Sequence, residues 1–323
     1  MNPIELITLL QKQTVYIQTH NFPDPDAIAS AFGLQQFLLA HGIPSSLCYA
    51  GKIDRLSSKK MLDTFCITML SKSEISHMTK HDYIVLVDSQ KLNANVTDLT
   101  GDEVACIDHH PTYFPIAYRY MDIQLVGSCS SIIASYYKQT STPPSALASA
   151  ALAYGIKMDT ADFSRMTTKL DIEMFAYLFE YADWSLVKKM YRNTLEFNDL
   201  KAYGAAIQNI KIFERTGFAY IPFNCSPALI AIISEFILSL NVIDVAIVYA
   251  FQKDGIRFSL RSDRRHINVG NLISQALYDI GGGGGHHAMA GGMIPKENVP
   301  LLGNDIPTTI QELFLDAYDY MID

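Results

Sequence analysis

Acidic and imidazole side chains gather near the start of the chain, in the stretch HNFPDPD. His20, Asp24 and Asp26 lie within seven residues of one another and follow the short apolar run 14–19. Carboxylate oxygens and imidazole nitrogens are atoms with which proteins hold divalent metal ions. This stretch therefore predicts a metal site where a strand passes into a helix.

Further groups of the same kind follow three other segments. Asp88 ends the apolar run 82–88, Asp108 ends the run 104–108, and Asp159 follows a segment of helical spacing. In an open parallel sheet, ligands bind beyond the carboxyl ends of the strands. We therefore expect one cluster at that edge of the sheet. Its members are His20, Asp24, Asp26, Asp88, Asp108, His109, His110 and Asp159.

Carboxylates gathered in this way need compensating charge, because like charges about 4–6 Å apart repel one another and some would have to take up a proton. Two divalent ions would balance the four carboxylates of Asp24, Asp26, Asp88 and Asp159. Imidazoles from His20 and His109 would complete a mixed coordination that suits Mn²⁺, and Mg²⁺ less well. Two such ions about 3.5–4 Å apart can generate a hydroxide and stabilise both the attacking and the leaving oxygens at phosphorus.

Each group taken alone also has a structural interpretation. Asp26 could cap the following helix, Asp88 could begin a turn, and His20 could be a hydrogen-bonded core histidine. The two histidines after Asp108 could lie in a solvated loop. The metal interpretation depends on the combination, because independent caps and turns would not all fall at the ends of successive strands.

The spacing of apolar residues predicts an α/β protein with two domains. In the first half, short apolar runs alternate with segments of helical length, which is typical of a parallel sheet covered by helices on both faces. Residues 160–210 have helical spacing throughout. Further on, Asp-Gly at 254–255 predicts a hairpin between two strands. We expect a catalytic domain at 1–187, a connecting segment at 188–212 and a smaller α/β domain at 213–323.

The composition excludes several classes of protein. Of the 323 residues, 49% are hydrophobic and 18% are charged, which is typical of a folded globular protein. The net charge of −8 argues against a grip on long duplex nucleic acid, which needs clustered Lys and Arg. Five scattered cysteines, with no pattern of a signal peptide or membrane span, predict a cytoplasmic protein without membrane contact. The sparse surface charge is compatible with a homodimer.

The chain resembles the DHH phosphoesterase family over nearly its whole length. The ordered motifs that carry the resemblance are HNFPDPDAIAS at 20–30, LVDSQ at 86–90, IDHHP at 107–111, GSCSS at 127–131 and GIKMDTADF at 155–163. The C-terminal part is similar to the DHH-associated substrate domain, whose GGGH signature corresponds to GGGHHAMAG at 283–291. Within the family, the chain looks like the phosphoesterases of nanoRNA and 3′,5′-bisphosphate nucleotides, relatives of the RecJ-like nucleases.

The resemblance implies a two-metal centre with manganese as the usual activator. One ion would be held by His20, Asp24 and Asp88, and the other by Asp26, Asp88, His109 and Asp159, with Asp88 bridging. The resemblance also implies that His110 contacts the substrate phosphate or helps to protonate the leaving group, while Asp108 orients a histidine. The chain departs from the family pattern at Asp162 and Met289, and either departure could reshape the substrate cleft.

A second set of candidates lies in the predicted C-terminal domain. Ordering the glycine run 281–285 costs backbone entropy, and glycines let backbone amides approach an anion closely. The alternative for this run is a flexible hinge. The guanidinium of Arg261 could grip a terminal phosphate or stack on a base. Ser128, in the serine motif, could contact substrate or cap a helix. The expected substrate contacts are Ser128, Arg261, Gly283, Gly284, Gly285 and His286.

These features predict a hydrolase that cleaves short nucleotide substrates by attack of a metal-bound hydroxide. The expected substrates are oligoribonucleotides, linear dinucleotides or 3′-phosphoadenosine 5′-phosphate. An inorganic pyrophosphatase or exopolyphosphatase would share the metal motifs without needing a nucleobase contact. A non-catalytic nucleotide sensor would be expected to lack at least one metal ligand, and every ligand is present here.

Overall fold

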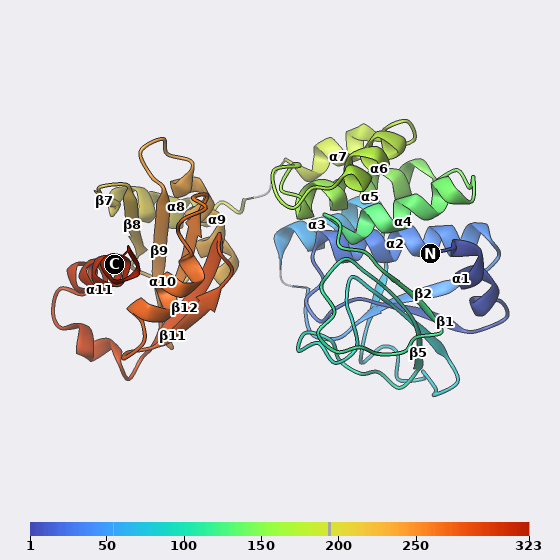
Figure 1. Ribbon diagram of the computed structural model, residues 1–323, viewed down its shortest axis with the longest axis horizontal. Coiled ribbons are helices and arrows are strands. Elements are labelled where there is room, and N and C mark those ends of the chain that lie inside the picture. Colours follow the sequence, from blue (N-terminus) through green and yellow to red (C-terminus); the bar gives the residue numbers. More distant parts are fainter. Residues whose placement is uncertain (54, 193–194, 323) are drawn as a thin grey trace. The chain divides into compact units, whose positions relative to one another are not determined.

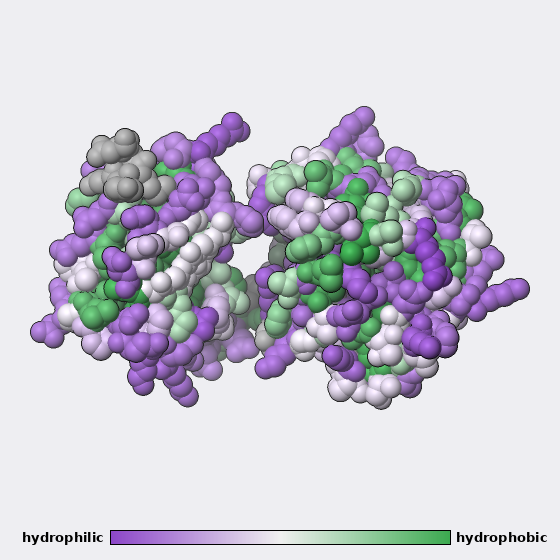
Figure 2. Space-filling view, turned by 60° about the horizontal axis from the view of Figure 1, so that its bottom comes forward, coloured by the Kyte–Doolittle hydropathy of each residue, from purple (hydrophilic) through white to green (hydrophobic). Residues whose placement is uncertain are grey.

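The computed structural model describes residues 1–53, 55–192 and 195–322, and the chain divides into two compact units, Met1–Thr194 and Leu195–Asp323 (Figure 1). On the face shown in Figure 2, hydrophobic residues are interspersed among hydrophilic ones on both units. Among the described residues, every helix is too short or too polar to span a lipid bilayer. Each unit contains its own six-stranded sheet.

The sheet of the first unit is entirely parallel. Its strands are β1 (Val15–Gln18), β2 (Ser45–Tyr49), β3 (Met69–Ser71), β4 (Tyr83–Val87), β5 (Asp102–Asp108) and β6 (Tyr120–Ile123). They lie in the order β3-β2-β1-β4-β5-β6, so the strand order reverses direction between β1 and β4. Such a reversal leaves a crevice at the carboxyl ends of the strands, where α/β proteins bind their ligands.

Helices α2 and α4 contact the strands on one face of this sheet, and α1 contacts β6. The remaining helices, α3, α5, α6 and α7, pack against α2 and α4 or against one another (Figure 1). The bounds of these helices are α1 (Pro3–Leu10), α2 (Pro25–Ala40), α3 (Leu56–Phe65), α4 (Cys129–Gln139), α5 (Ala146–Asp159), α6 (Lys169–Phe179) and α7 (Trp184–Met190). The first turns of α2, α4 and α5 are fixed by side-chain caps from Asp24, Ser128 and Ser145. Gly33 permits the close approach of α2 to α5, because a Cβ atom there would lie 2.7 Å from Cδ2 of Leu152.

The α/β class and the parallel sheet are confirmed, but the second face of the sheet is covered differently from the prediction. Tyr16, Leu86 and Cys106 belong to that face and pack with Ile75 and Met78 from the connection between β3 and β4. Irregular chain takes the place of the expected helices here, because this short, polar connection leaves little room for a helix and its two turns.

The second unit has a mixed sheet in the order β11-β12-β10-β9-β8-β7. Neighbouring strands are antiparallel except for β8 and β9. Its strands are β7 (Lys211–Phe213), β8 (Thr216–Ile221), β9 (Val245–Gln252), β10 (Gly255–Ser262), β11 (Gly282–Gly285) and β12 (Met289–Pro295). The helices are α8 (Asp199–Gln208), α9 (Pro227–Leu238), α10 (Val269–Ala276) and α11 (Ile306–Ile322), with a 3-10 turn at Val299–Leu302. Helices α8 and α9 cover one face, and α10 and α11 the other.

The prediction of helix throughout residues 160–210 is wrong in part. Helix α5 ends at Asp159, and three successive residues with positive φ, at 161–163, turn the chain before α6 begins. The predicted connecting segment 188–212 contains α8, which packs on β8 in the second unit. Apolar spacing could not show the first of these breaks, because the turn residues Ala161 and Phe163 are themselves apolar.

The glycine run 281–285 is neither an open loop nor a hinge. Four of its residues form the edge strand β11, paired with β12. Glycine is required at both ends of the run, since a Cβ atom at Gly281 or Gly285 would collide with a carbonyl oxygen of β12. A strand of glycines carries no side-chain pattern, so its sequence does not predict it.

Candidate metal centre and active site

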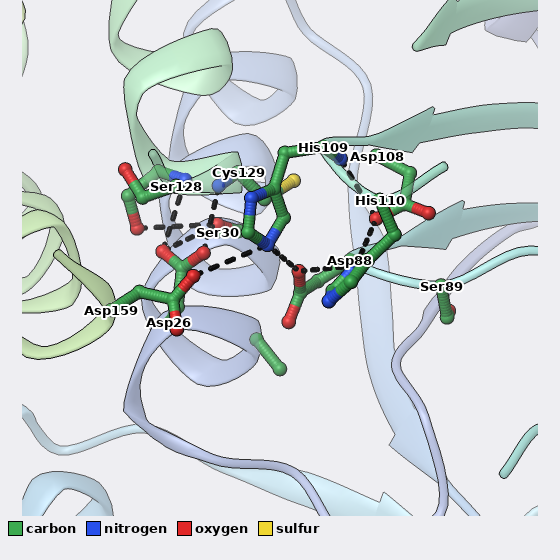
Figure 3. Close-up of polar contacts among 12 residues, drawn as sticks. Asp26, Ser30, Asp88, Ser89, Asp108, His109, His110, Ser128, Cys129 and Asp159 are labelled. Carbon is green, nitrogen blue, oxygen red and sulfur yellow. Dashed lines mark hydrogen bonds and ion pairs between the residues drawn. The ribbon is translucent and has the colours of Figure 1, made fainter. Parts of the chain in front are cut away.

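The acidic and imidazole residues singled out in the sequence lie together beyond the carboxyl ends of β1, β4 and β5 (Figure 3). Among the residues that the structure describes, three groups of His and Asp have donor atoms that lie, within each group, no more than 4.8 Å from one another. They are His20, Asp24 and Asp88; Asp26, His109 and Asp159; and Asp88, Asp108, His109 and His110. The first two groups correspond to the two ligand sets implied by the resemblance, with Asp88 in the first.

Asp24 is the N-cap of α2, and this role leaves one of its oxygens for the centre. Its Oδ1 accepts hydrogen bonds from the backbone amides of Asp26 and Ala27, both at 3.1 Å. Its Oδ2 lies 3.9 Å from Nη1 of Arg55. The interpretation of Asp26 as the helix cap is therefore wrong, since Asp24 is the cap and Asp26 lies in the first turn.

Asp26 points inward and is 2% exposed. Its two carboxylate oxygens accept hydrogen bonds from the first turn of α4, Oδ2 from the amide of Cys129 at 2.7 Å and Oδ1 from that of Ser130 at 3.0 Å. Gly155 of α5 is packed beside it. A Cβ atom at Gly155 would lie 2.7 Å from Cβ of Ala29 and 3.1 Å from Oδ1 of Asp26. Helices α2, α4 and α5 therefore meet next to this carboxylate.

Asp88 lies at the middle of the centre, in a left-handed conformation with φ 55° directly after β4. Its Oδ2 lies 3.7 Å from Nε2 of His20, and its Oδ1 lies 3.3 Å from Nε2 of His109. This Oδ1 is buried and has no donor in hydrogen-bonding geometry. A buried carboxylate oxygen without a donor is costly, and a cation bound there would remove that cost.

His109 presents one ring nitrogen to the centre. Its Nδ1 is 3.1 Å from the carbonyl oxygen of Val126, and because a carbonyl only accepts, Nδ1 carries a proton. Its Nε2 then faces Asp88 and also Oδ2 of Asp159, 3.2 Å away. Asp159 is in turn held from outside by Arg165, whose Nη2 donates to the Asp159 carbonyl oxygen at 2.8 Å. An imidazole fixed through Nδ1 in this way is the usual form of a metal-ligating histidine.

His110 is oriented by a fully buried carboxylate. Nδ1 of His110 donates to Oδ1 of Asp108 at 2.9 Å, and Oδ2 of Asp108 accepts from Nε2 of Gln90 at 2.7 Å. This hydrogen bond to Asp108 raises the pKa of His110. The side chain of His110 is 52% exposed, so its other nitrogen can reach a ligand. This arrangement suits a proton donor.

The sequence did not single out Gln90, although it lies two residues after Asp88 in the LVDSQ motif. The available signal was a polar residue just after the apolar run that ends at Asp88. Ser128 proves to be fully buried, and it caps α4 by accepting from the amide of Ser131 at 3.2 Å. Ser128 therefore has a structural role at the start of α4. Contact of Ser128 with substrate stays a prediction, and the burial of the side chain does not support it.

The electrostatics of the centre favour bound cations. Burial, with the charge of Asp159 nearby, raises the pKa of Asp26 to about 7. Burial also raises the pKa of Asp88 and that of Asp159. For His109, burial lowers the pKa, but the close carboxylate of Asp88 and the charge of Asp26 outweigh it and raise the pKa to about 11. Each shift opposes the form that binds a metal, so ions would displace these protons. The residues therefore fit a pair of divalent ions.

Thermal stability should respond to Mn²⁺ more strongly at pH 8 than at pH 5.5. The raised pKa of Asp26 contributes stability that is fully present below about pH 4 and is lost as the pH rises through about 7. The raised pKa of His109 likewise contributes stability, which is lost as the pH rises from about 6.5 to about 11. The metal-free protein is thus weakened at pH 8, where deprotonated ligands also bind ions best. At pH 8, each ion at 100 times its Kd should stabilise the protein by roughly 3 kcal/mol relative to the metal-free form. Differential scanning fluorimetry in Mn²⁺ and in EDTA measures the corresponding Tm shift at each pH. An equal Tm shift at both pH values would contradict this prediction.

The substrate candidates of the second unit lie around the β10-β12-β11 end of its sheet. Arg261 of β10 is paired with the carboxylate of Glu235 on α9, and its Nη1 donates to the carbonyl oxygen of Leu260 at 2.8 Å. His286 follows β11 and is exposed. A cavity of about 380 Å³ opens over this part of the sheet. It is lined by Pro227, Ile230, Arg257, Phe258, Gly282, Gly283, Gly291, Gly292 and Met293.

Two family models match the chain, the N-terminal domain of the DHH family over residues 14–156 and the DHHA1 domain over residues 215–312. The chain belongs to the DHH family. In this DHH protein, the first match runs from β1 into α5 and contains the described centre except for Asp159. The second match begins just before β8 and ends within α11, and so contains Arg261 and the glycine strand.

The DHH protein is similar in sequence to proteins that carry different names. The uncharacterized protein MJ1633 of Methanocaldococcus jannaschii is 29% identical over 287 residues, which cover 88% of this chain and 59% of that protein. This chain thus spans about three fifths of MJ1633. The probable bifunctional oligoribonuclease and PAP phosphatase NrnA of Streptococcus mutans is 27% identical over 277 residues, 79% of this chain and 83% of NrnA.

Among solved structures, an exopolyphosphatase-related protein from Bacteroides fragilis matches the DHH protein with a TM-score of 0.74. The match covers 99% of this chain and 97% of that one, at 16% sequence identity. At that identity, the similarity shows the fold.

Proposed function

We propose that this DHH protein hydrolyses phosphoester bonds of short nucleotides with the help of two divalent metal ions, preferably Mn²⁺. The observation that carries the proposal is the buried Oδ1 of Asp88, which has no hydrogen-bond donor although it lies among four further carboxylates and three imidazoles. Neither a capping role nor a turn accounts for such an oxygen. A cation site does.

In this proposal, His20, Asp24 and Asp88 hold one ion, and Asp26, His109 and Asp159 hold the other, with Asp88 reaching both. Two bound ions supply a nucleophilic water at neutral pH and positive charge for the phosphate oxygens. The donor set contains both carboxylates and imidazoles, which suits Mn²⁺ better than Mg²⁺. The protein contributes fixed positions, because backbone amides and carbonyl groups hold Asp24, Asp26 and His109.

His110 is the proposed proton donor to the leaving oxygen. Its Nδ1 is fixed by Asp108, so the exposed Nε2 side of the ring can face the substrate. Asp108 remains a carboxylate, since hydrogen bonds from His110 and Gln90 lower its pKa despite its burial. A negative partner stabilises the protonated imidazole, and the proton is then available for an alkoxide that departs from phosphorus.

The second unit supports a nucleotide as substrate. The cavity over β10, β11 and β12 is within the size range of small-ligand pockets, about 300–1,000 Å³, and its glycines leave the backbone accessible. Arg257 lines this cavity and Arg261 lies further along the same strand. NrnA, by its name, acts on oligoribonucleotides and on PAP. We propose Arg261, Gly283–Gly285 and His286 as contacts of the substrate's nucleotide end.

A panel of substrates tests this function. With Mn²⁺ present, we expect turnover of RNA of two to five nucleotides, of linear dinucleotides or of 3′-phosphoadenosine 5′-phosphate. Rates should fall to background in EDTA and return when Mn²⁺ is restored. Initial rates from chromatographic separation of the products measure this for each substrate at equal concentration.

The same panel includes pyrophosphate, polyphosphate and cyclic dinucleotides. Pyrophosphate or polyphosphate as the sole substrate would replace the proposed function by the pyrophosphatase alternative. Tight nucleotide binding without any turnover would point to a sensor. Preference for long duplex RNA or DNA would also contradict the proposal, since the acidic surface disfavours such a partner.

A further inference from the structure

We propose that Asp171 is a positioning residue, which holds the start of α4 and thereby sets the orientation of Asp26 in the metal centre. This inference rests on the proposed function. Asp171 lies in the first turn of α6 and is fully buried. It is neither a member of the metal-ligand groups nor part of the motifs found in the sequence.

The carboxylate of Asp171 accepts hydrogen bonds from two separate parts of the chain. Locally, Thr168 donates to Oδ2 through its amide at 2.8 Å and its hydroxyl at 2.6 Å. From the serine motif, Ser131 Oγ and Ser128 Oγ donate to Oδ1 at 2.6 and 3.3 Å, and the amide of Gly127 donates to Oδ2 at 2.9 Å. A helix cap needs only the local pair. The other three bonds therefore fix the segment 127–131.

Gly127 is fitted to this contact. A Cβ atom at Gly127 would lie 2.7 Å from Oδ2 of Asp171, so a larger residue would push the carboxylate away from the segment. The glycine thus lets the backbone come close enough to donate directly. A buried carboxylate with several donors is held rigidly, because loss of any one donor leaves charge unsatisfied.

The same segment also holds Asp26 (Figure 3). The amides of Cys129 and Ser130, which donate to the two oxygens of Asp26, are in the first turn of α4 and have no partner within the helix. The positive end of the helix also favours the carboxylate. Both oxygens are therefore held by the backbone of α4, and one Asp26 oxygen lies within 4.8 Å of donor atoms of His109 and Asp159.

The path from Asp171 to the centre is thus short and specific. Asp171 holds Gly127, Ser128 and Ser131, and the two residues between them, Cys129 and Ser130, hold Asp26. The group of His20, Asp24 and Asp88 is positioned by β1, β4 and the cap of α2 and makes no use of this path. Loss of Asp171 should therefore affect one ion far more than the other.

Asp183 offers a matched contrast in the same unit. It caps α7 by accepting from the amide and the hydroxyl of Ser185, at 2.9 and 2.6 Å, and it is exposed. The hydrogen bonds of its side chain are local. Asp183→Asn therefore removes a comparable cap without touching the segment 127–131.

Asp171→Asn should weaken Mn²⁺ binding at the Asp26 group by roughly 10–100-fold and leave the other group unchanged, as expected for a residue that orients a ligand. Asparagine keeps the size of the side chain but loses its charge and turns an NH₂ group toward donors. Calorimetric titration of metal-free protein with MnCl₂ gives the number of ions and both affinities without any substrate. Asp183→Asn should titrate like the wild type.

A milder variant covers the case in which Asp171→Asn does not fold, as judged by circular dichroism. Ser131→Ala removes the 2.6 Å hydrogen bond to Asp171, together with the 2.9 Å contact between the hydroxyls of Ser131 and Ser128. It should weaken the same ion several-fold. Two unchanged sites, or equal weakening of both, in either folded variant would overturn the inference. Wild-type protein that binds no Mn²⁺ would instead overturn the proposed function.

Discussion

Replacing Asp88 with alanine should lower kcat/KM for the best short nucleotide substrate by about 10³-fold or more at saturating Mn²⁺. The carboxylate is 3% exposed, and its two oxygens face His20 and His109, one from each ligand group. Its loss would disturb both ions, and ions at phosphorus supply several kcal/mol of charge stabilisation, of which about 4 kcal/mol corresponds to 10³-fold. Initial rates over a range of substrate concentration measure the effect.

Asp102→Ala is the matched control for this variant. Asp102 begins β5 at the other end of the same sheet and forms an exposed ion pair with Arg119. Such a pair contributes little to stability, so its loss should change kcat/KM by no more than about twofold. Near-normal activity in Asp88→Ala would rule out the mechanism proposed here.

His110→Ala should lower kcat for RNA by roughly 10²–10⁴-fold, the range of a lost general acid. The loss should be much smaller for a nucleotide ester of 4-nitrophenol, because 4-nitrophenolate departs without a proton whereas a ribose oxygen does not. The ratio of the two losses, from initial rates under the same conditions, is the measurement. Equal losses for both esters would assign His110 to phosphate binding instead.

Asp108→Asn should carry the signature of the same pair in its pH profile. The hydrogen bond that His110 donates to Asp108 raises the pKa of His110, so the protonated ring persists to higher pH in the wild type. Without that carboxylate, the rate should begin to fall at lower pH as the acid form is lost. An unchanged alkaline limb would show that another group supplies the proton.

The location of the site was predictable from the sequence because the rule behind it is topological. Asp88 and Asp108 each end an apolar run, and strands of a parallel sheet bring such ends to one edge. The start of the following helix could be predicted from residue types known to begin helices, but the cap was assigned to Asp26 instead of Asp24, because aspartate occurs at both positions. Apolar spacing did not predict the short strands β2, β3 and β6. Many of their residues are half-buried or polar, so their sequences show no clear alternation of apolar and polar residues.

The residues that position the side chains of the candidate site were harder to find from the sequence. Gln90 and Asp171 touch the site through hydrogen bonds to partners 18 and 40 or more residues away in sequence. No local pattern encodes contacts of that range. Each is a buried polar residue, and burial is known only once the fold is known. The glycine strand β11 was missed for the opposite reason, since it has no side chains with which to show a period.

The contact at Gly155 has a consequence for how such a protein can change. There, three helices meet within a few ångströms of the carboxylate of Asp26, a proposed metal ligand, and even a methyl group has no room. The spacing of the proposed metal ligands is therefore set by the packing of these helices and cannot be changed in small steps. A new substrate specificity would therefore have to arise from residues outside the proposed metal centre. The preferred substrate could then change in evolution while the proposed mechanism of hydrolysis stayed the same.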